Sequence, residues 1–400
     1  MKAIAKPKLA TYVGDCTQIE RAIKLGVDHL ILEHPRLSIR SWQQPSIDNP
    51  IPAIERLIKY AKSLNQSIEL SLNMDMLIQH NQDDLIAQLS AWIVGSSLQA
   101  IRVQDVGLLH HFHGLIECVL DSQMGNINWV GVKTLATLAK RQCLSLDIAY
   151  PDIDLIYEKT QARLELMVHG PICIQYSQRR YMQGLFDQQQ PSAALSQYHQ
   201  LAEDDDYPGR RFTFLDNPHG HFMFAYFDRS LLHDLDQLKQ CPLDYWVIDT
   251  RGQDSNYHQA CIKAYRCALD ANDLDNKNLQ AAIKTVKSLA PKPLKPGFFR
   301  ANQTDRRRFK KRAAQLNEEE TSLGVVLDIW EKRWVIIECL APLNCGDQVA
   351  ARHPKIADCQ FELNQLFDLN HQKLASAQPG QLIKIPWVKG LQQQSILVGL

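Results

Sequence analysis

The sequence predicts an α/β fold: a (β/α)₈, TIM-like barrel with an insertion, followed by a small C-terminal β-barrel domain. Three observations lead to this prediction. Eight short apolar runs occur in the first 250 or so residues, helix-length amphipathic stretches separate most of them, and the texture becomes strand-like after about residue 320. Apolar strands that alternate with helices favour a parallel sheet with covered faces. Eight such units favour closure into a barrel.

The barrel is expected to occupy residues 1–290. Its strands are expected where β-branched residues and leucine gather, at Leu9–Val13, His29–Leu32, Ile68–Leu72, Ala100–Val103, Glu117–Leu120, Ser145–Ile148, Glu165–Val168 and Tyr245–Ile248. The clearest helical patterns between them are Cys16–Leu25, Ile51–Ser63, Asp83–Val94, Trp129–Lys140 and Asp152–Thr160. Two further helices, Asn256–Asp270 and Leu279–Leu289, should follow the last strand.

The repeat breaks once, at about 180–230, and this predicts an insertion between the seventh and eighth strands. Two strands, Phe212–Leu215 and His221–Phe224, are expected there, joined by the turn-forming residues Asp216–Gly220. Prolines and a glycine at 291–297 then mark a break. Residues 291–320 are predicted to be a linker and basic segment, and residues 321–400 a β-barrel domain with turns such as Pro379-Gly380.

Composition narrows the function classes. Forty-four basic and 44 acidic residues cancel, so affinity for a polyanion must come from a local patch. The chain has no signal-peptide pattern and no apolar run of about 18 residues, so we expect a cytoplasmic protein without a membrane partner. None of its ten cysteines forms a CxxC pair, and no serine, metal or nucleotide-binding motif occurs.

Polar residues after the strands are the candidate site, because reactive groups of such barrels gather at the carboxyl ends of the strands. They are Arg36, Arg40, Asn73, Asp105, Gln123, Asn128, His169, Asp249 and Arg251. Cationic and amide side chains suit a ligand that bears a carboxylate or phosphate. Alternatively, several of these residues are helix caps or turn residues.

A basic run lies in the segment before the last domain. It consists of Arg306, Arg307, Arg308, Lys310, Lys311 and Arg312. Such a run is typical of a solvated helix face, and it could equally bind a phosphate backbone.

The stretch Glu165–Arg180, ELMVHGPICIQYSQRR, resembles the signature of the peptidase U32 family at Glu165, His169, Gly170 and Cys173, among others. Weaker matches cover nearly the whole chain, most like the tRNA-hydroxylating branch. That resemblance implies prephenate-dependent 5-hydroxylation of the tRNA wobble uridine. tRNA and an anionic small molecule such as prephenate would then be partners.

The resemblance also implies roles for the candidate residues. Catalytic residues would be His169, Gln123, Asn128 and Asp249, and substrate-binding residues would be Arg36, Arg40, Asn73, Asp105 and Arg251. The basic run Arg306–Arg312 would contact RNA.

The family's [4Fe–4S] cluster is not expected here, because four thiolates normally hold such a cluster. Cys173 is the sole surviving ligand of the family pattern. Arg180 occupies the second position, and Gly184–Asp216 contains no cysteine for the other two. No cofactor is therefore predicted. The alternatives are a catalytically degenerate paralogue that serves as a binding or partner subunit of a cluster-bearing homologue, and a U32-type peptidase, which the family name alone suggests.

Overall fold

The computed structural model describes residues 6–41, 49–121, 125–182, 198–203, 210–271, 273–274, 276–301, 321–331, 333–353 and 356–400. The chain divides into two compact units, Met1–Asn302 and Gln303–Leu400. Each unit is described separately.

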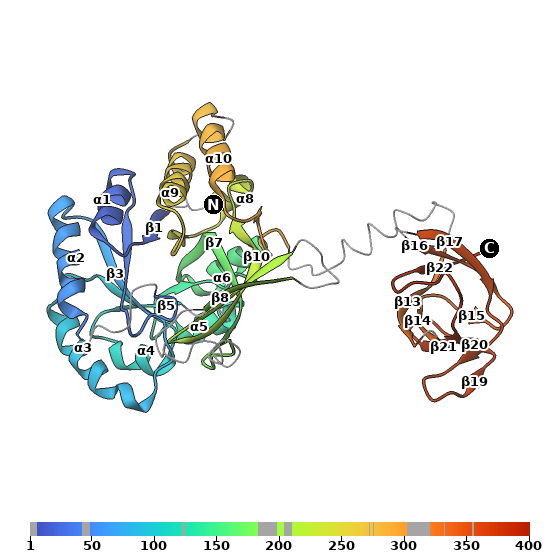
Figure 1. Cartoon of the computed structure of the whole chain (residues 1–400). Helices are drawn as coiled ribbons and strands as arrows, with labels where there is room; N and C mark the ends of the chain where they lie inside the picture. Colours follow the sequence, from blue (N-terminus) through green and yellow to red (C-terminus); the bar gives the residue numbers. More distant parts are fainter. Residues whose placement is uncertain are drawn as a thin grey trace. The chain divides into compact units, whose positions relative to one another are not determined.

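The first unit is a closed barrel of eight parallel strands (Figure 1). The strands are β1 (Lys8–Tyr12), β2 (His29–Glu33), β3 (Glu69–Met74), β4 (Ala100–Val103), β5 (Glu117–Asp121), β6 (Arg141–Cys143), β7 (Arg163–Ser177) and β11 (Tyr245–Ile248). Each strand pairs in parallel with the next, and β11 pairs with both β7 and β1. The predicted (β/α)₈ architecture is confirmed.

Helices follow most of the strands and cover the barrel with their apolar faces. They are α1 (Cys16–Lys24), α2 (Ile51–Leu64), the short 3₁₀ helix η1 (His80–Gln82), α3 (Asp83–Gly95), α4 (Val106–Phe112), α5 (Trp129–Leu135), α6 (Tyr150–Thr160), α8 (Leu235–Gln240), α9 (Ser255–Asp270) and α10 (Lys277–Leu289). Side-chain oxygens of Asp15, Asp105 and Asn128 accept backbone N–H groups at the starts of α1, α4 and α5. In the described ranges, no helix is long and apolar enough to cross a membrane.

The sixth strand corrects the sequence prediction. It was expected at Ser145–Ile148, but it lies at Arg141–Cys143, and α5 ends at Leu135 rather than Lys140. The strand could not be recognised in the sequence because Arg141 and Gln142 are polar, and polar residues are rarely buried in a sheet. Arg141 is buried because its guanidinium faces the Glu165 carboxylate inside the barrel, with 3.2 Å between Nε and Oε1.

The insertion extends the barrel sheet outward. The 15-residue strand β7 continues past the barrel and pairs antiparallel with β10 (Gly220–Ser230), which pairs with β9 (Arg211–Asn217). β8 (Tyr198–Glu203) and β12 (Leu294–Lys295) complete this extension. The two predicted strands are thus confirmed and are longer than expected. Gly220 has a φ of 139°, and a Cβ there would lie 2.1 Å from the Ser177 carbonyl oxygen, so the turn requires glycine.

Described regular elements of the second unit are all strands, paired antiparallel around an apolar core. They are β13 (Ser322–Trp330), β14 (Trp334–Cys339), β15 (Leu343–Asn344), β16 (Gln348–His353), β17 (Ile356–Glu362), β18 (Leu366–Phe367), β19 (Lys373–Leu374), β20 (Ser376–Ala377), β21 (Leu382–Pro386) and β22 (Ile396–Gly399). β13 holds the centre of this sheet, between β14 and β22. This agrees with the predicted change to an all-β texture.

Candidate functional site

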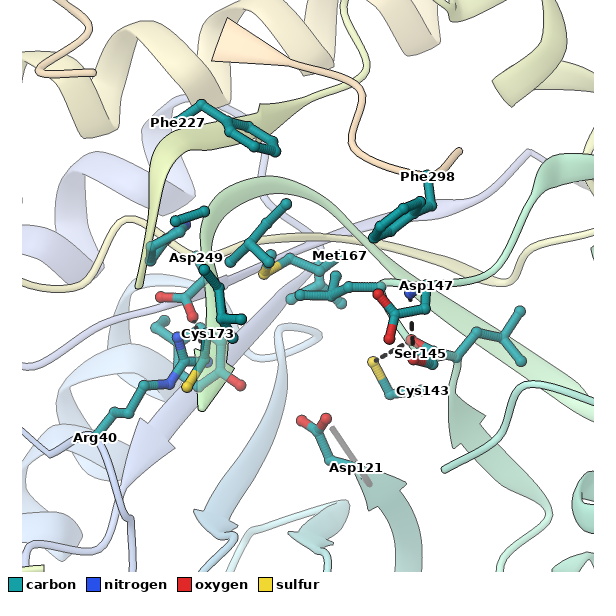
Figure 2. A pocket seen from close by; sticks show the side chains of 18 of the residues that line it. Arg40, Asp121, Cys143, Ser145, Asp147, Met167, Cys173, Phe227, Asp249 and Phe298 are labelled. Atoms are coloured by element: carbon teal, nitrogen blue, oxygen red, sulfur yellow. Dashed lines mark hydrogen bonds and ion pairs between the residues drawn. The ribbon is translucent and has the colours of Figure 1, made fainter. Parts of the chain in front are cut away.

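A pocket of about 320 Å³ opens at the carboxyl ends of the barrel strands (Figure 2). Its lining residues come from the strand ends, from the loops that follow them, from the insertion and, at Phe298, from the segment after β12. The polar ones are Tyr12, Arg40, Arg102, Asp121, Cys143, Ser145, Asp147, Cys173 and Asp249. Two arginines and three aspartates line the pocket, so its ionic side chains nearly cancel in charge.

The floor of the pocket rests on a buried ion-pair network. Arg102 is completely buried; its Nη2 lies 2.8 Å from Asp121 Oδ2, and its Nη1 lies 2.6 Å from Glu165 Oε2. Glu165 also faces Arg141. These carboxylates hold the pKa of Arg102 far above its usual value despite the opposing effect of burial. Asp121 alone of these acids reaches the pocket, where Figure 2 shows it opposite Phe227 and Phe298.

A second network surrounds Asp249, which follows β11. Arg251 donates to both Asp249 oxygens at 2.8–2.9 Å and to Glu33 at 2.6 Å. The Arg251 guanidinium also lies 3.7 Å from the Tyr12 ring centroid. Although burial opposes the charged carboxylate, Arg251 and Arg40 hold the pKa of Asp249 well below its usual range. The Arg251 guanidinium is thus bonded to Asp249 and Glu33, and it does not line the pocket.

Arg40 is the arginine best placed for a ligand. Its Nη2 lies 2.8 Å from Asp249 Oδ2, its side chain is 11% exposed, and its buried Nε has no hydrogen-bond partner. A buried donor without a partner is costly, so a ligand oxygen would satisfy it. Arg36 belongs to the same loop, is half-buried and does not line this pocket.

The loop that carries Arg40 is held from two sides. The Ile39 N–H donates to Asp75 Oδ1 at 2.9 Å, and the Ile39 carbonyl accepts from Asn217 Nδ2 at 3.1 Å. Asn73, which is fully buried, donates to Ser38 Oγ at 2.7 Å. Asn73 and the insertion hairpin therefore position the loop, so that Arg40 meets Asp249 at the pocket.

Aromatic side chains form the outer wall of the pocket. They are Phe212, Tyr226, Phe227 and Phe298, and three of them come from the insertion. Phe212 and Tyr226 meet edge to face with ring centroids 5.7 Å apart, and Tyr226 and Phe227 do so at 5.0 Å. Such a wall suits a planar, largely apolar ligand.

His169 lies away from the pocket. Its ring is fully buried against α9, with Nε2 2.7 Å from the Tyr257 hydroxyl oxygen and 3.3 Å from Cys261 Sγ. Burial lowers the pKa of His169 to about 3, so the imidazole is neutral. The His169 carbonyl accepts the Asp249 N–H at 2.8 Å, but the imidazole turns away from Arg40 and Asp249 and does not line the pocket.

The buried His169 predicts a dependence of stability on pH. An unfolded histidine titrates near pH 6.5, so below that pH the unfolded chain binds a proton that folded His169 refuses. This single group should remove about 2 kcal/mol of stability between pH 7 and pH 5. Urea unfolding should show a smaller pH dependence for His169→Gln than for the wild type. The exposed-site control His110→Gln should behave as the wild type; equal pH dependence in all three would contradict the assignment.

Two other sequence candidates cap helices. Asp105 accepts the Leu108 N–H at 2.9 Å, and the exposed Asn128 accepts the Gly131 N–H at 2.9 Å. Neither lines the pocket. Gln123 and the run Arg306–Arg312 lie outside the described residues.

Sequence reasoning missed several pocket residues, including Arg102, Cys143 and the aromatic wall. Arg102 could have been predicted, because a charged residue inside the apolar run Ala100–Val103 indicates a buried ion pair in the barrel. Cys143 was missed together with the sixth strand. No sequence pattern indicated that β9 and β10 would turn their aromatic residues toward the pocket.

The described residues do not fit a [4Fe–4S] cluster. All ten cysteines are described, and only Cys143 and Cys173 line the pocket. Burial raises the pKa of both thiols, which disfavours the thiolates that iron needs. Within the described ranges, no group of three or more His, Cys, Asp and Glu side chains could hold a metal ion.

Comparison with known proteins gives consistent matches at low identity. Residues 14–308 match the model of peptidase family U32. An uncharacterized protease of Methanocaldococcus jannaschii is 23% identical over 94% of this chain and 94% of its own length. A tRNA hydroxylation protein P1 of Bacillus subtilis is 21% identical over 98% of this chain and 94% of its length. A tRNA hydroxylation protein P of Escherichia coli is 22% identical, covering 75% of this chain and 76% of its own.

Proposed function

Because this chain belongs to the peptidase U32 family, we propose that it takes part in 5-hydroxylation of the tRNA wobble uridine, with the pocket at the barrel mouth as its ligand site. The observation that carries the proposal is the pocket itself, where Arg40 offers an unsatisfied donor beside an aromatic wall. Two of the relatives are tRNA hydroxylation proteins, and this supports the choice of RNA.

Arg40 would bind an oxygen of the small-molecule ligand, through a charge-assisted hydrogen bond. One ligand carboxylate near Arg40 would meet a group of opposite charge. A second carboxylate in the pocket would instead face Asp121 or Asp147 and be repelled. A dicarboxylate such as prephenate would thus need its ring against the aromatic wall, one carboxylate at Arg40 and the other directed out of the pocket, away from Asp121 and Asp147. Arg251 would act indirectly, by holding Asp249 and Tyr12 in place.

Hydroxylation of uracil is an oxidation, and it needs a redox group that the donor set around Cys173 does not fit. We propose that a cluster-bearing homologue supplies this group as a partner. Peptide hydrolysis is a poorer match, because burial raises the pKa of the pocket thiols Cys143 and Cys173, whereas a nucleophilic cysteine needs a depressed pKa. The sequence run Arg306–Arg312 remains a candidate for phosphate contacts.

Hydroxyuridine in tRNA tests the proposal. A strain without this gene should lose most of the modified nucleoside, measured by mass spectrometry of digested tRNA, and a plasmid copy should restore it. In a strain that also lacks the cluster-bearing homologues, the same copy should restore nothing. Unchanged hydroxyuridine in the first strain would contradict the function. Restoration in the second would contradict the need for a partner.

A further inference from the structure

The outer side of the aromatic wall carries positive charge. Exposed Lys295, on β12, places its Nζ 4.5 Å from the Tyr226 ring centroid, 5.2 Å from the Phe227 centroid and 2.7 Å from the Tyr226 hydroxyl oxygen. Exposed Arg210, immediately before β9, places its guanidinium carbon 5.2 Å from the Tyr226 ring centroid. We call Arg210, Lys295, Phe212, Tyr226 and Phe227 the cationic rim.

The cationic rim and the pocket differ in charge. The inner side of the wall faces Asp121, Asp147 and Asp249, and the pocket arginines Arg40 and Arg102 are ion-paired with carboxylates. An anionic group is therefore favoured at the rim, whereas the pocket has one unsatisfied donor for a ligand oxygen, the Arg40 Nε, and its remaining charges favour a neutral ring. A chain of alternating phosphates and neutral rings has this pattern of charge.

We infer that the cationic rim binds a single-stranded RNA segment, with phosphates at Arg210 and Lys295 and one base turned over Phe227 into the pocket. The inference rests on the proposed function in naming RNA as the partner. Aromatic side chains interleaved with cations are the usual means of binding unpaired nucleotides, since bases stack on rings and phosphates meet Lys or Arg. A base must leave its stack before an enzyme can modify it.

Neighbouring groups support the choice of these two cations. Lys292 is half-buried and donates to the Ala225 carbonyl at 3.0 Å. It therefore stabilises the backbone of the aromatic wall and is poorly placed to contact a phosphate. Arg210 and Lys295 both lie against the ring of Tyr226, which lines the pocket. The two positive charges are therefore close to each other and to the edge of the pocket.

Binding of a labelled tRNA anticodon stem-loop to the full-length protein tests the inference. The double variant Arg210→Ala, Lys295→Ala should bind more weakly, and its plot of log affinity against log salt concentration should be shallower by about 1.4, at about 0.7 for each lost phosphate contact. Phe227→Ala should lose about 5- to 150-fold in affinity through lost stacking. The matched control, Arg56→Ala with Lys59→Ala on α2, should bind as the wild type, since both residues are exposed and neither lines the pocket.

The contrary results are distinct. Equal affinity and equal salt dependence of the rim double variant and the wild type would overturn the inference, as would equal binding of an RNA duplex of the same length. Competition by polyglutamate as strong as that by unlabelled stem-loop would assign the rim to acidic proteins instead. If wild-type protein restores hydroxyuridine while rim variants bind RNA normally, only the rim assignment fails. If deletion leaves hydroxyuridine unchanged while rim variants lose RNA binding, only the proposed function fails.

Discussion

Replacing Glu165 with alanine is expected to lower the free energy of unfolding by about 3–5 kcal/mol, because it leaves buried cations without their partner. Glu165 is fully buried and lies 2.6 Å from Arg102 Nη1 and 3.2 Å from Arg141 Nε. Arg102 would keep Asp121, but among the described acids Arg141 would keep only the half-buried Glu117, 3.7 Å from its Nε, besides its contact with the Tyr245 ring. Urea unfolding at pH 7 measures the loss.

Two further variants distinguish the loss of the buried charge from the effect of replacing any glutamate in the chain. Glu158→Ala removes an exposed carboxylate from α6 and should change stability by less than about 0.5 kcal/mol. Glu165→Gln keeps the shape of the side chain and should still destabilise strongly, because the cations stay buried without a negative charge. If Glu165→Gln is as stable as the wild type, the barrel interior does not depend on this ion-pair network.

The alternation of apolar runs and helices was sufficient to predict the barrel. Seven of the eight strands could be located because leucine and β-branched residues fill them, as in Ala100–Val103 and Tyr245–Ile248. The sixth strand could not be located, because two of its three residues, Arg141 and Gln142, are polar. Its burial depends on Glu165, which lies 24 positions away, and no local pattern reports such a pairing.

The candidate site could be predicted in part. The rule that strand ends carry the site led to Arg40 and Asp249, which do meet at the pocket. The same rule could not separate caps from pocket residues, since Asp105 and Asn128 follow strands and yet begin helices. It also could not place His169, whose ring turns toward α9 because an irregularity in the pairing of β7 with β11 after Met167 interrupts the alternation of faces there. The aromatic wall depends on how the insertion folds back, which lies beyond local sequence.

Replacing Arg40 with alanine is expected to abolish most of the function while the fold persists. Loss of a charge-assisted hydrogen bond should weaken the small-molecule ligand by about 10- to 150-fold. Asp249 would keep its two bonds to Arg251, so the site should stay folded, and the melting temperature should show this. Arg40→Lys keeps the charge without the planar fork and should retain only part of the function.

The hydroxyuridine content of tRNA is the most direct measurement of whether the barrel-mouth pocket is the working site. Deletion strains that express the wild type, Arg40→Ala or the exposed-site control Arg56→Ala should be compared at equal protein levels. We expect wild type and Arg56→Ala to restore the modified nucleoside, and Arg40→Ala to leave it near the level of the deletion strain. Full restoration by a folded Arg40→Ala protein would contradict the assignment of this pocket.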